Sequence, residues 1–237
     1  MLQNIRDLYG SRLATPDGDV GHVQDFYFDD LTWALRYLVA DTGPWLTGRL
    51  VLLSPRAFGR LNEVDGNALI INLTRTQIEG SPAIETHQPV SRQYEIEYHR
   101  YYGWPINRGG GETRAAEVVP LAAEAPPGGN NLQRKDRHLR STKATKRYQV
   151  QTIDGVLGHA SGFMVDDRNW EIRKLVVEAG HWYSGEEVQI SVQKIDRISD
   201  QESKVFVNLT EAEIRKLPGT GSARLKVLDH RAGAPQR

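Results

Sequence analysis

The chain contains one segment twice, and this duplication constrains the fold more than any other feature of the sequence. Residues 18–55 align with residues 155–192 at a constant offset of 137, and 15 of the 38 aligned pairs are identical. Residues 71–82 align with residues 207–218 at an offset of 136. Two copies of one structural unit are therefore expected. The identical pairs include residue types that turns and tight packing require, and the predicted structural positions are Gly21, Trp33, Gly48, Gly158, Trp170 and Gly185.

Each copy has the local pattern of antiparallel β-structure. Asp17-Gly18 and Asp154-Gly155 are typical hairpin turn pairs, and apolar residues alternate in the segments that follow. Each copy then reaches a capping box, Thr74-x-x-Gln77 or Thr210-x-x-Glu213, which predicts a short helix. Several short strands would leave exposed edges in a flat sheet, so closure into a small barrel is expected.

These patterns predict a mainly β protein with two small antiparallel barrels in tandem, each closed by a short helix. The predicted divisions are residues 1–86 for the first barrel, 87–141 for a connector, 142–218 for the second barrel and 219–237 for a tail. The connector is predicted to begin with an amphipathic aromatic helix and to continue as a flexible Gly/Pro-rich linker between about residues 107 and 131.

The composition excludes several classes of site. The chain has no cysteine, so disulfides, thiolate catalysis and cysteine-based metal sites are absent. It has no apolar run long enough to span a membrane, and its first ten residues lack the pattern of a signal peptide, so a cytoplasmic location is expected. Residues 1–86, 87–147, 148–218 and 219–237 carry net charges of −4, +5, −4 and +3, an alternation that favours attraction within or between copies of the chain over a broad nucleic-acid surface.

The repeated segments DGDVGHVQDFYFDD and DGVLGHASGFMVDD, with the closing INLTRTQI and VNLTEAEI, resemble the PRC-barrel family. That family includes the cytoplasmic barrel of the photosynthetic reaction centre H subunit and the C-terminal barrel of the ribosome maturation factors. RYYGWP and DRHLRS also resemble the connector of bacterial tandem PRC-barrel proteins. The resemblance implies an assembly or interaction module with no shared catalytic residues, and this chain lacks the H subunit's N-terminal membrane helix.

Two repeated histidines are the sharpest candidates for chemistry. His22 and His159 lie near Asp25 and the Asp-Asp pairs at 29–30 and 166–167, a combination that could conduct protons or bind a metal. The favoured interpretation is local hydrogen bonding of the histidines, with the Asp-Asp pairs forming turns. No metal, cofactor or catalytic residue is predicted, and an acid–base or metal-dependent enzyme is the least favoured hypothesis.

Two further groups of residues are candidates for binding. The first is an aromatic stripe at helical spacing, which is predicted to dock on the chain's own barrel, on a sister chain or on a ligand. The second is a basic run, for which pairing within or between chains is favoured over contact with RNA, the ribosome, an anionic membrane or a small anion. The stripe comprises Tyr94, Tyr98, Tyr101, Tyr102 and Trp104, and the basic run, within residues 134–147, is represented by Arg134, Lys135, Arg137 and Arg140.

The leading functional hypothesis is a non-enzymatic protein-interaction or assembly module that self-associates. The first alternative is an RNA-binding or ribosome-associated protein that uses residues 134–147. The second is an accessory protein of a photosynthetic or other membrane complex, related to the reaction centre H subunit. The partner is expected to be protein, as a homo-oligomer.

Overall fold

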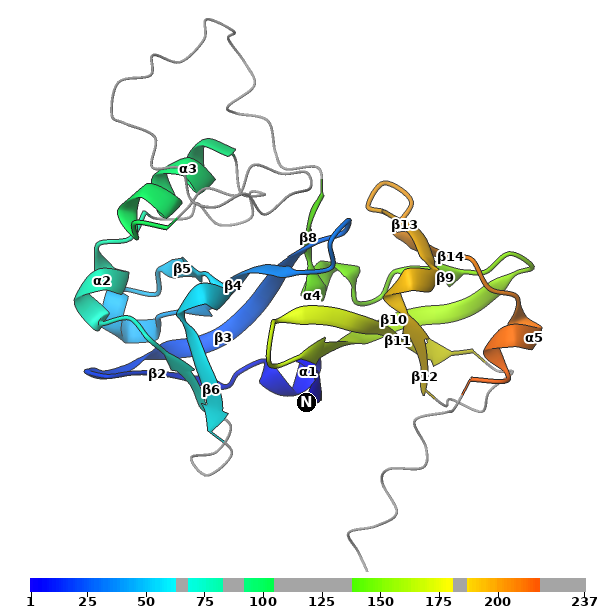
Figure 1. Cartoon of the computed structure of the whole chain (residues 1–237), viewed down its shortest axis with the longest axis horizontal. Coiled ribbons are helices and arrows are strands. Elements are labelled where there is room, and N and C mark those ends of the chain that lie inside the picture. Colours follow the sequence, from blue (N-terminus) through cyan, green and yellow to red (C-terminus); the bar gives the residue numbers. More distant parts are fainter. Residues whose placement is uncertain (63–67, 83–91, 105–137, 181–186, 218–237) are drawn as a thin grey trace, which may run out of the picture. The chain divides into compact units, whose positions relative to one another are not determined.

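The structure is a computed structural model that describes residues 1–62, 68–82, 92–104, 138–180 and 187–217 (Figure 1). The predicted mainly β class is confirmed, because these residues form two sheets of seven strands with few helices. Within the described residues, no helix is long and apolar enough to cross a membrane.

The two sheets have equivalent strand orders, as the duplication predicts. The order in one sheet is β5-β4-β3-β2-β7-β6, and β8 also pairs with β3. In the other it is β12-β11-β10-β9-β14-β13, and β1 also pairs with β10. In the described part of the chain, no pairing joins β12 to β13 or β5 to β6, the end strands of the two paths. The pairs β2–β7 and β9–β14 are parallel, so the prediction of wholly antiparallel strands is wrong. The strand bounds are β1 Leu2–Asn4, β2 Arg12–Thr15, β3 Gly18–Asp29, β4 Leu35–Asp41, β5 Leu50–Leu53, β6 Phe58–Asn62, β7 Ala68–Ile71, β8 Leu139–Ser141, β9 Gln149–Gln151, β10 Val156–Asp166, β11 Glu171–Ala179, β12 Glu187–Ser191, β13 Ile195–Ser199 and β14 Lys204–Val207.

Both predicted capping boxes are present. The Thr74 hydroxyl accepts a hydrogen bond from the Gln77 backbone N–H, and the Gln77 side chain accepts one from the Thr74 N–H. Thr210 and Glu213 make the same reciprocal pair. These bonds satisfy N–H groups that the first turn of a helix leaves without partners. The α-helices are α1 Ile5–Leu8, α2 Arg75–Glu79, α3 Arg92–Tyr101, α4 Thr142–Thr145 and α5 Glu211–Ile214, and the 3₁₀ turns are Gly43–Leu46, Pro55–Ala57 and Val192–Lys194.

The chain forms two compact units that are discontinuous in sequence. Unit 1 comprises Met1–Tyr9, Asp25–Arg36 and Arg140–Arg237, and unit 2 comprises Gly10–Gln24 and Tyr37–Leu139. The end of the β3–β4 hairpin, although it belongs to the first sequence copy, is therefore part of unit 1. The domain boundaries at residues 86, 141 and 218 stay predictions.

Each unit has its own apolar core. In unit 1 the fully buried side chains include Phe26, Phe28 and Phe163, which come from both sequence copies. In unit 2 they include Leu38 of β4 and Leu52 of β5. The alternation of buried and exposed residues along the strands gives each sheet an apolar face, and burial of that face stabilises the unit.

Candidate interaction site

The candidate interaction site is built around two equivalent hairpin tips of unit 1. In the tip between β3 and β4, the Asp29 carbonyl accepts the Trp33 N–H at 2.8 Å, and in the tip between β10 and β11 the Asp166 carbonyl accepts the Trp170 N–H at 2.8 Å. Both tryptophans have left-handed backbone, with φ of 60° and 56°. The turns therefore have the same geometry, and in each of them a tryptophan occupies the left-handed backbone position, which is strained for a residue with a side chain.

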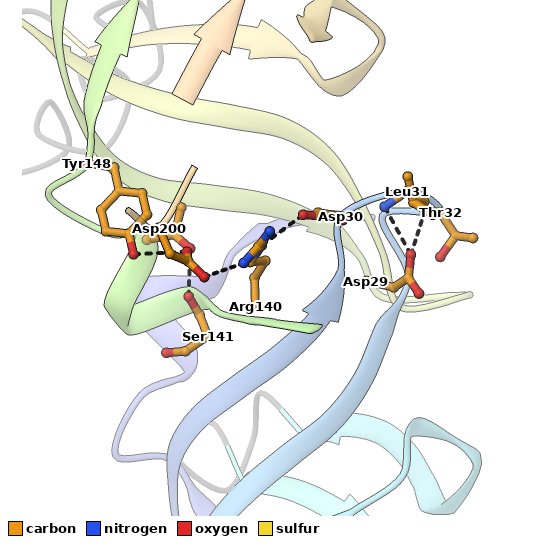
Figure 2. Close-up of polar contacts among 9 residues, drawn as sticks. Asp29, Asp30, Leu31, Thr32, Arg140, Ser141, Tyr148 and Asp200 are labelled. Carbon is orange, nitrogen blue, oxygen red and sulfur yellow. Dashed lines mark hydrogen bonds and ion pairs between the residues drawn. The ribbon is translucent and has the colours of Figure 1, made fainter. Parts of the chain in front are cut away.

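The first aspartate of each Asp-Asp pair forms its turn. One carboxylate oxygen of Asp29 accepts the backbone N–H groups of Leu31 at 3.0 Å and Thr32 at 2.9 Å (Figure 2). Asp166 accepts the N–H of Arg168 at 3.2 Å, and this bond lowers the pKa of Asp166. The turn-forming role predicted for these aspartates is confirmed.

The two tips pack against each other through reciprocal contacts. The Leu35 N–H donates to the Trp170 carbonyl at 2.9 Å, and the Ile172 N–H donates to the Trp33 carbonyl at 2.8 Å. Leu35 and Ile172 are equivalent in the repeat, as are the two tryptophans. The two bonds are thus related by a local two-fold symmetry, the arrangement found in an isologous dimer contact.

Apolar side chains cover these backbone bonds. The Phe28 and Phe163 rings are fully buried, with centroids 5.2 Å apart, and Phe28 also stacks on Trp33 at 5.6 Å. Burying rings of this size contributes several kcal/mol, of the order of 3–5 kcal/mol per ring by truncation. We call this set of contacts the tip interlock.

Two short segments, which we call arms, are related by the same symmetry. The N-terminal arm consists of β1 and α1, and the second arm consists of β8 and α4, 137 residues later. β1 pairs with β10, with Gln3 opposite Val165, while β8 pairs with β3. Each arm therefore pairs with the long strand of the other sequence copy.

The places where the two arms pack differ at one pair of equivalent residues, Asp25 and Gly162. Asp25 of β3 accepts hydrogen bonds from the Ser141 hydroxyl at 2.5 Å, the Thr142 hydroxyl at 2.9 Å and the Lys143 N–H at 3.1 Å. Its equivalent is Gly162, where an added Cβ would lie 3.1 Å from both the Asn4 Oδ1 and the Arg6 Cγ atoms. The carboxylate therefore fits the second arm, and the glycine leaves room for the first.

Arg140, which belongs to β8 of the second arm, lies between two carboxylates (Figure 2). Its Nε donates to Asp30 at 2.8 Å, and its Nη1 donates to Asp200, which also accepts the Tyr148 hydroxyl at 3.0 Å. Burial alone would lower the pKa of the Arg140 guanidinium, but the bond to Asp30 and the charges of Asp30 and Asp200 raise it. Arg140 is therefore held within unit 1 by carboxylates at Asp30 and Asp200. Arg134, Lys135 and Arg137 lie outside the described residues.

The predicted aromatic helix is α3, and its rings pack within unit 2. Tyr98 is fully buried, its hydroxyl accepts the Ser54 N–H at 2.9 Å, and its ring meets Tyr37 edge-on at 5.6 Å. Tyr94 donates to the Pro82 carbonyl at 2.8 Å. These contacts dock the helix on its own unit.

The rest of the stripe continues this cluster. Tyr102 lies 4.9 Å from Tyr98 and stacks on Trp104 at 4.6 Å. Tyr101 is the most exposed of the five, at 43%, and donates to the Gln77 carbonyl at 2.9 Å. A role of the stripe in binding a partner stays a prediction, and only Tyr101 presents a large exposed surface for it.

Unit 2 should lose stability at alkaline pH because of these buried phenols. Burial raises the pKa of Tyr98 well above 10.0 and that of Tyr102 to about 12. The stabilising effect of a raised pKa is complete below the unfolded-state value and is lost as pH rises from that value through the folded-state value. We expect the urea midpoint to fall steadily from pH 10 to pH 12, with Tyr98→Phe reducing the slope. A midpoint that does not change over this range would contradict the assignment.

The structure separates the candidate histidines from most of the aspartates beside them in sequence. His159 lies opposite Glu178 in the sheet, seven residues along β10 from Asp166. His22 lies opposite Arg12 in unit 2, whereas Asp25 contacts the second arm in unit 1. In the part of the chain that the structure describes, no group of three or more His, Asp or Glu residues is placed to hold a metal ion.

The predicted structural residues occupy demanding backbone positions. Gly21 has φ +125° and Gly158 φ +159°, and each lies against a backbone carbonyl of the neighbouring strand. Gly48 has φ +71°. Gly185 lies outside the described residues.

The arms were not predicted from the sequence. Two signals were available at the 137-residue offset, the identical pair Leu2 and Leu139 and the helix-capping residue types Asn4 and Ser141. The interval between the arms and the main aligned block has little identity, which separates these two signals from the rest of the repeat.

No family model and no curated protein matches this chain.

Proposed function

We propose that the chain is a non-catalytic protein-interaction module made of two PRC-type barrels, in which each repeat is an association unit. The tip interlock carries the proposal: the Leu35–Trp170 and Ile172–Trp33 bonds are reciprocal contacts between equivalent residues. Such contacts are the ones by which two identical subunits associate. The PRC-barrel resemblance and the equivalent strand orders of the two sheets support the same proposal.

In this proposal, the residues that the two copies share have structural roles. Gly21 and Gly158 allow close strand approach, the tip tryptophans make the reciprocal bonds, and the turn aspartates cap backbone N–H groups. Partner specificity would then come from residues in which the copies differ. A second copy of the chain is the proposed partner, and a cytoplasmic location stays a prediction.

Association of the repeats can be tested in the full chain with a protease site inserted between residues 109 and 131. After cleavage, the two fragments should co-elute in size-exclusion chromatography, because the tip interlock and both arms hold them without the connector. Fragments that elute separately while retaining β-sheet circular dichroism would contradict the proposal.

Self-association of the intact chain is tested independently by light scattering on the same column. A mass that rises toward a multiple of 26.7 kDa with concentration is expected. A strict monomer at high concentration would remove the homo-oligomer and leave another protein as partner.

The RNA-binding alternative receives no support from Arg140. Its guanidinium already contacts Asp30 and Asp200, and an added phosphate would have to displace these carboxylates.

A further inference from the structure

Unit 1 contains a pocket of about 520 Å³ beside the first arm. This volume lies within the range of small-molecule sites. Its lining combines three basic side chains, a histidine and a serine with one acidic side chain and the backbone of β10 and β11. The lining residues used below are Arg6, Lys146, Arg147, His159, Ser161 and Glu178.

The charge of this pocket is positive overall. Arg6 reaches it from the N-terminal arm and forms an ion pair with Glu187 at 2.8 Å, and Ser161 also donates to Glu187 at 3.2 Å. Lys146 and Arg147 follow α4, and both are exposed. Glu178 is the one carboxylate residue in the lining, which also holds three cationic residues, one of them, Arg6, ion-paired with Glu187.

Arg147 occupies a backbone conformation that a residue with a side chain rarely adopts. Its φ is 103°, and its N–H donates to the Ala160 carbonyl at 2.8 Å. The equivalent residue of the first repeat is Gly10, with φ 77°, where glycine accepts a positive φ without steric cost. The second copy thus places an arginine in a strained position that glycine fills in the first, and strain of this kind is concentrated at functional sites.

The equivalent positions of the first repeat do not make a basic pocket. Tyr9 of the first repeat is equivalent to Lys146 of the second. The Tyr9 ring centroid lies 5.0 Å from the Lys143 ammonium group, and the Tyr9 hydroxyl is hydrogen-bonded to the Thr142 hydroxyl at 2.8 Å. Gly10 replaces Arg147. The cationic pocket is therefore specific to the second repeat, and it includes Arg6 from the N-terminal arm.

We propose that this pocket binds the phosphate group of a small phosphorylated molecule. Guanidinium groups recognise phosphate oxygens through paired N–H donors, so Arg147, with the neighbouring Lys146, is the proposed phosphate ligand. Arg6, which is ion-paired with Glu187, adds a positive charge from the N-terminal arm. His159 and Glu178 lie opposite each other in the sheet and line the same space, where they can contact the hydroxyl groups of the ligand. Because Arg6 belongs to the N-terminal arm, which pairs with β10, the site rests on the proposed repeat association, but phosphate binding is measured separately from that association.

Calorimetric titration of the full chain with inorganic phosphate and with glycerol 3-phosphate tests the proposal, with glycerol as the uncharged probe. We expect saturable binding of both anions and none of glycerol. Tighter binding of glycerol 3-phosphate would assign the site to a phosphomonoester, and equal binding would assign it to free phosphate. Arg147→Gly should weaken phosphate affinity by roughly tenfold or more.

The stability of Arg147→Gly separates ligand binding from a structural role. Its melting temperature without phosphate should equal or exceed that of the unmodified chain, because relief of strain offsets the greater flexibility of unfolded glycine. Lys216→Ala, which removes one exposed charge outside the pocket, should leave affinity unchanged. Absence of saturable phosphate binding, or equal affinities of the Arg147→Gly and Lys216→Ala chains, would overturn the proposal.

Discussion

Gly158→Ala is expected to destabilise unit 1 strongly, and Gly21→Ala to do the same to unit 2. An added Cβ would lie 2.1 Å from the Glu178 carbonyl oxygen in the first case and 2.0 Å from the Asp41 carbonyl oxygen in the second. Both obstacles are backbone atoms of a paired strand, so a rotamer change cannot relieve the clash. Each substitution should cost at least about 3 kcal/mol in the free energy of unfolding, measured by urea denaturation.

Gly180→Ala is the matched control for Gly158→Ala. Gly180 and its equivalent Gly43 are also identical in the two copies, but an added Cβ at Gly180 has its nearest contact at 3.8 Å. We expect its free energy of unfolding to change by less than about 0.5 kcal/mol. Equal losses in the Gly158 and Gly180 variants would show that close strand approach is not the reason for the repeated glycine.

Tyr98→Ala is expected to destabilise unit 2 strongly. The substitution removes a fully buried ring that contacts Tyr37, Tyr94 and Tyr102, and it leaves the Ser54 N–H without its hydroxyl acceptor. The ring alone accounts for about 3–5 kcal/mol in the free energy of unfolding. The loss should be measurable by urea denaturation followed by near-ultraviolet circular dichroism, which reports the packed aromatic cluster.

Tyr101→Ala provides the comparison on the same helix. Its side chain is 43% exposed, and its hydroxyl donates one bond, to the Gln77 carbonyl. The expected loss is about 1 kcal/mol. If the Tyr98 and Tyr101 variants lose equal stability, the docking of α3 seen in the structure is wrong. A change in self-association is informative only for Tyr101→Ala, because the loss of Tyr98 alters the fold itself.

Local signals in the sequence predicted local structure well. The capping boxes at Thr74 and Thr210 form as expected, because each involves residues three positions apart. The turn role of Asp29 and Asp166 follows from short-range bonds in the same way. Helical spacing placed Tyr94, Tyr98 and Tyr101 on α3, and Tyr102 and Trp104 follow its end. The spacing could not decide whether the rings pack inside unit 2 or face a partner. That choice depends on Tyr37 and Ser54, which lie more than 40 residues away.

The duplication was readable from the sequence alone, because equivalent turns and strands require the same glycines, aspartates and tryptophans in both copies. Only the tertiary structure decided that both copies contribute to the core of unit 1. Asp25 contacts Ser141 across 116 residues, Arg140 contacts Asp30 across 110, and Leu35 bonds to Trp170. The alignment shows that two segments are equivalent, but it does not show whether they touch. Contact depends on shape and polar complementarity between distant segments, and these appear only when the chain is folded.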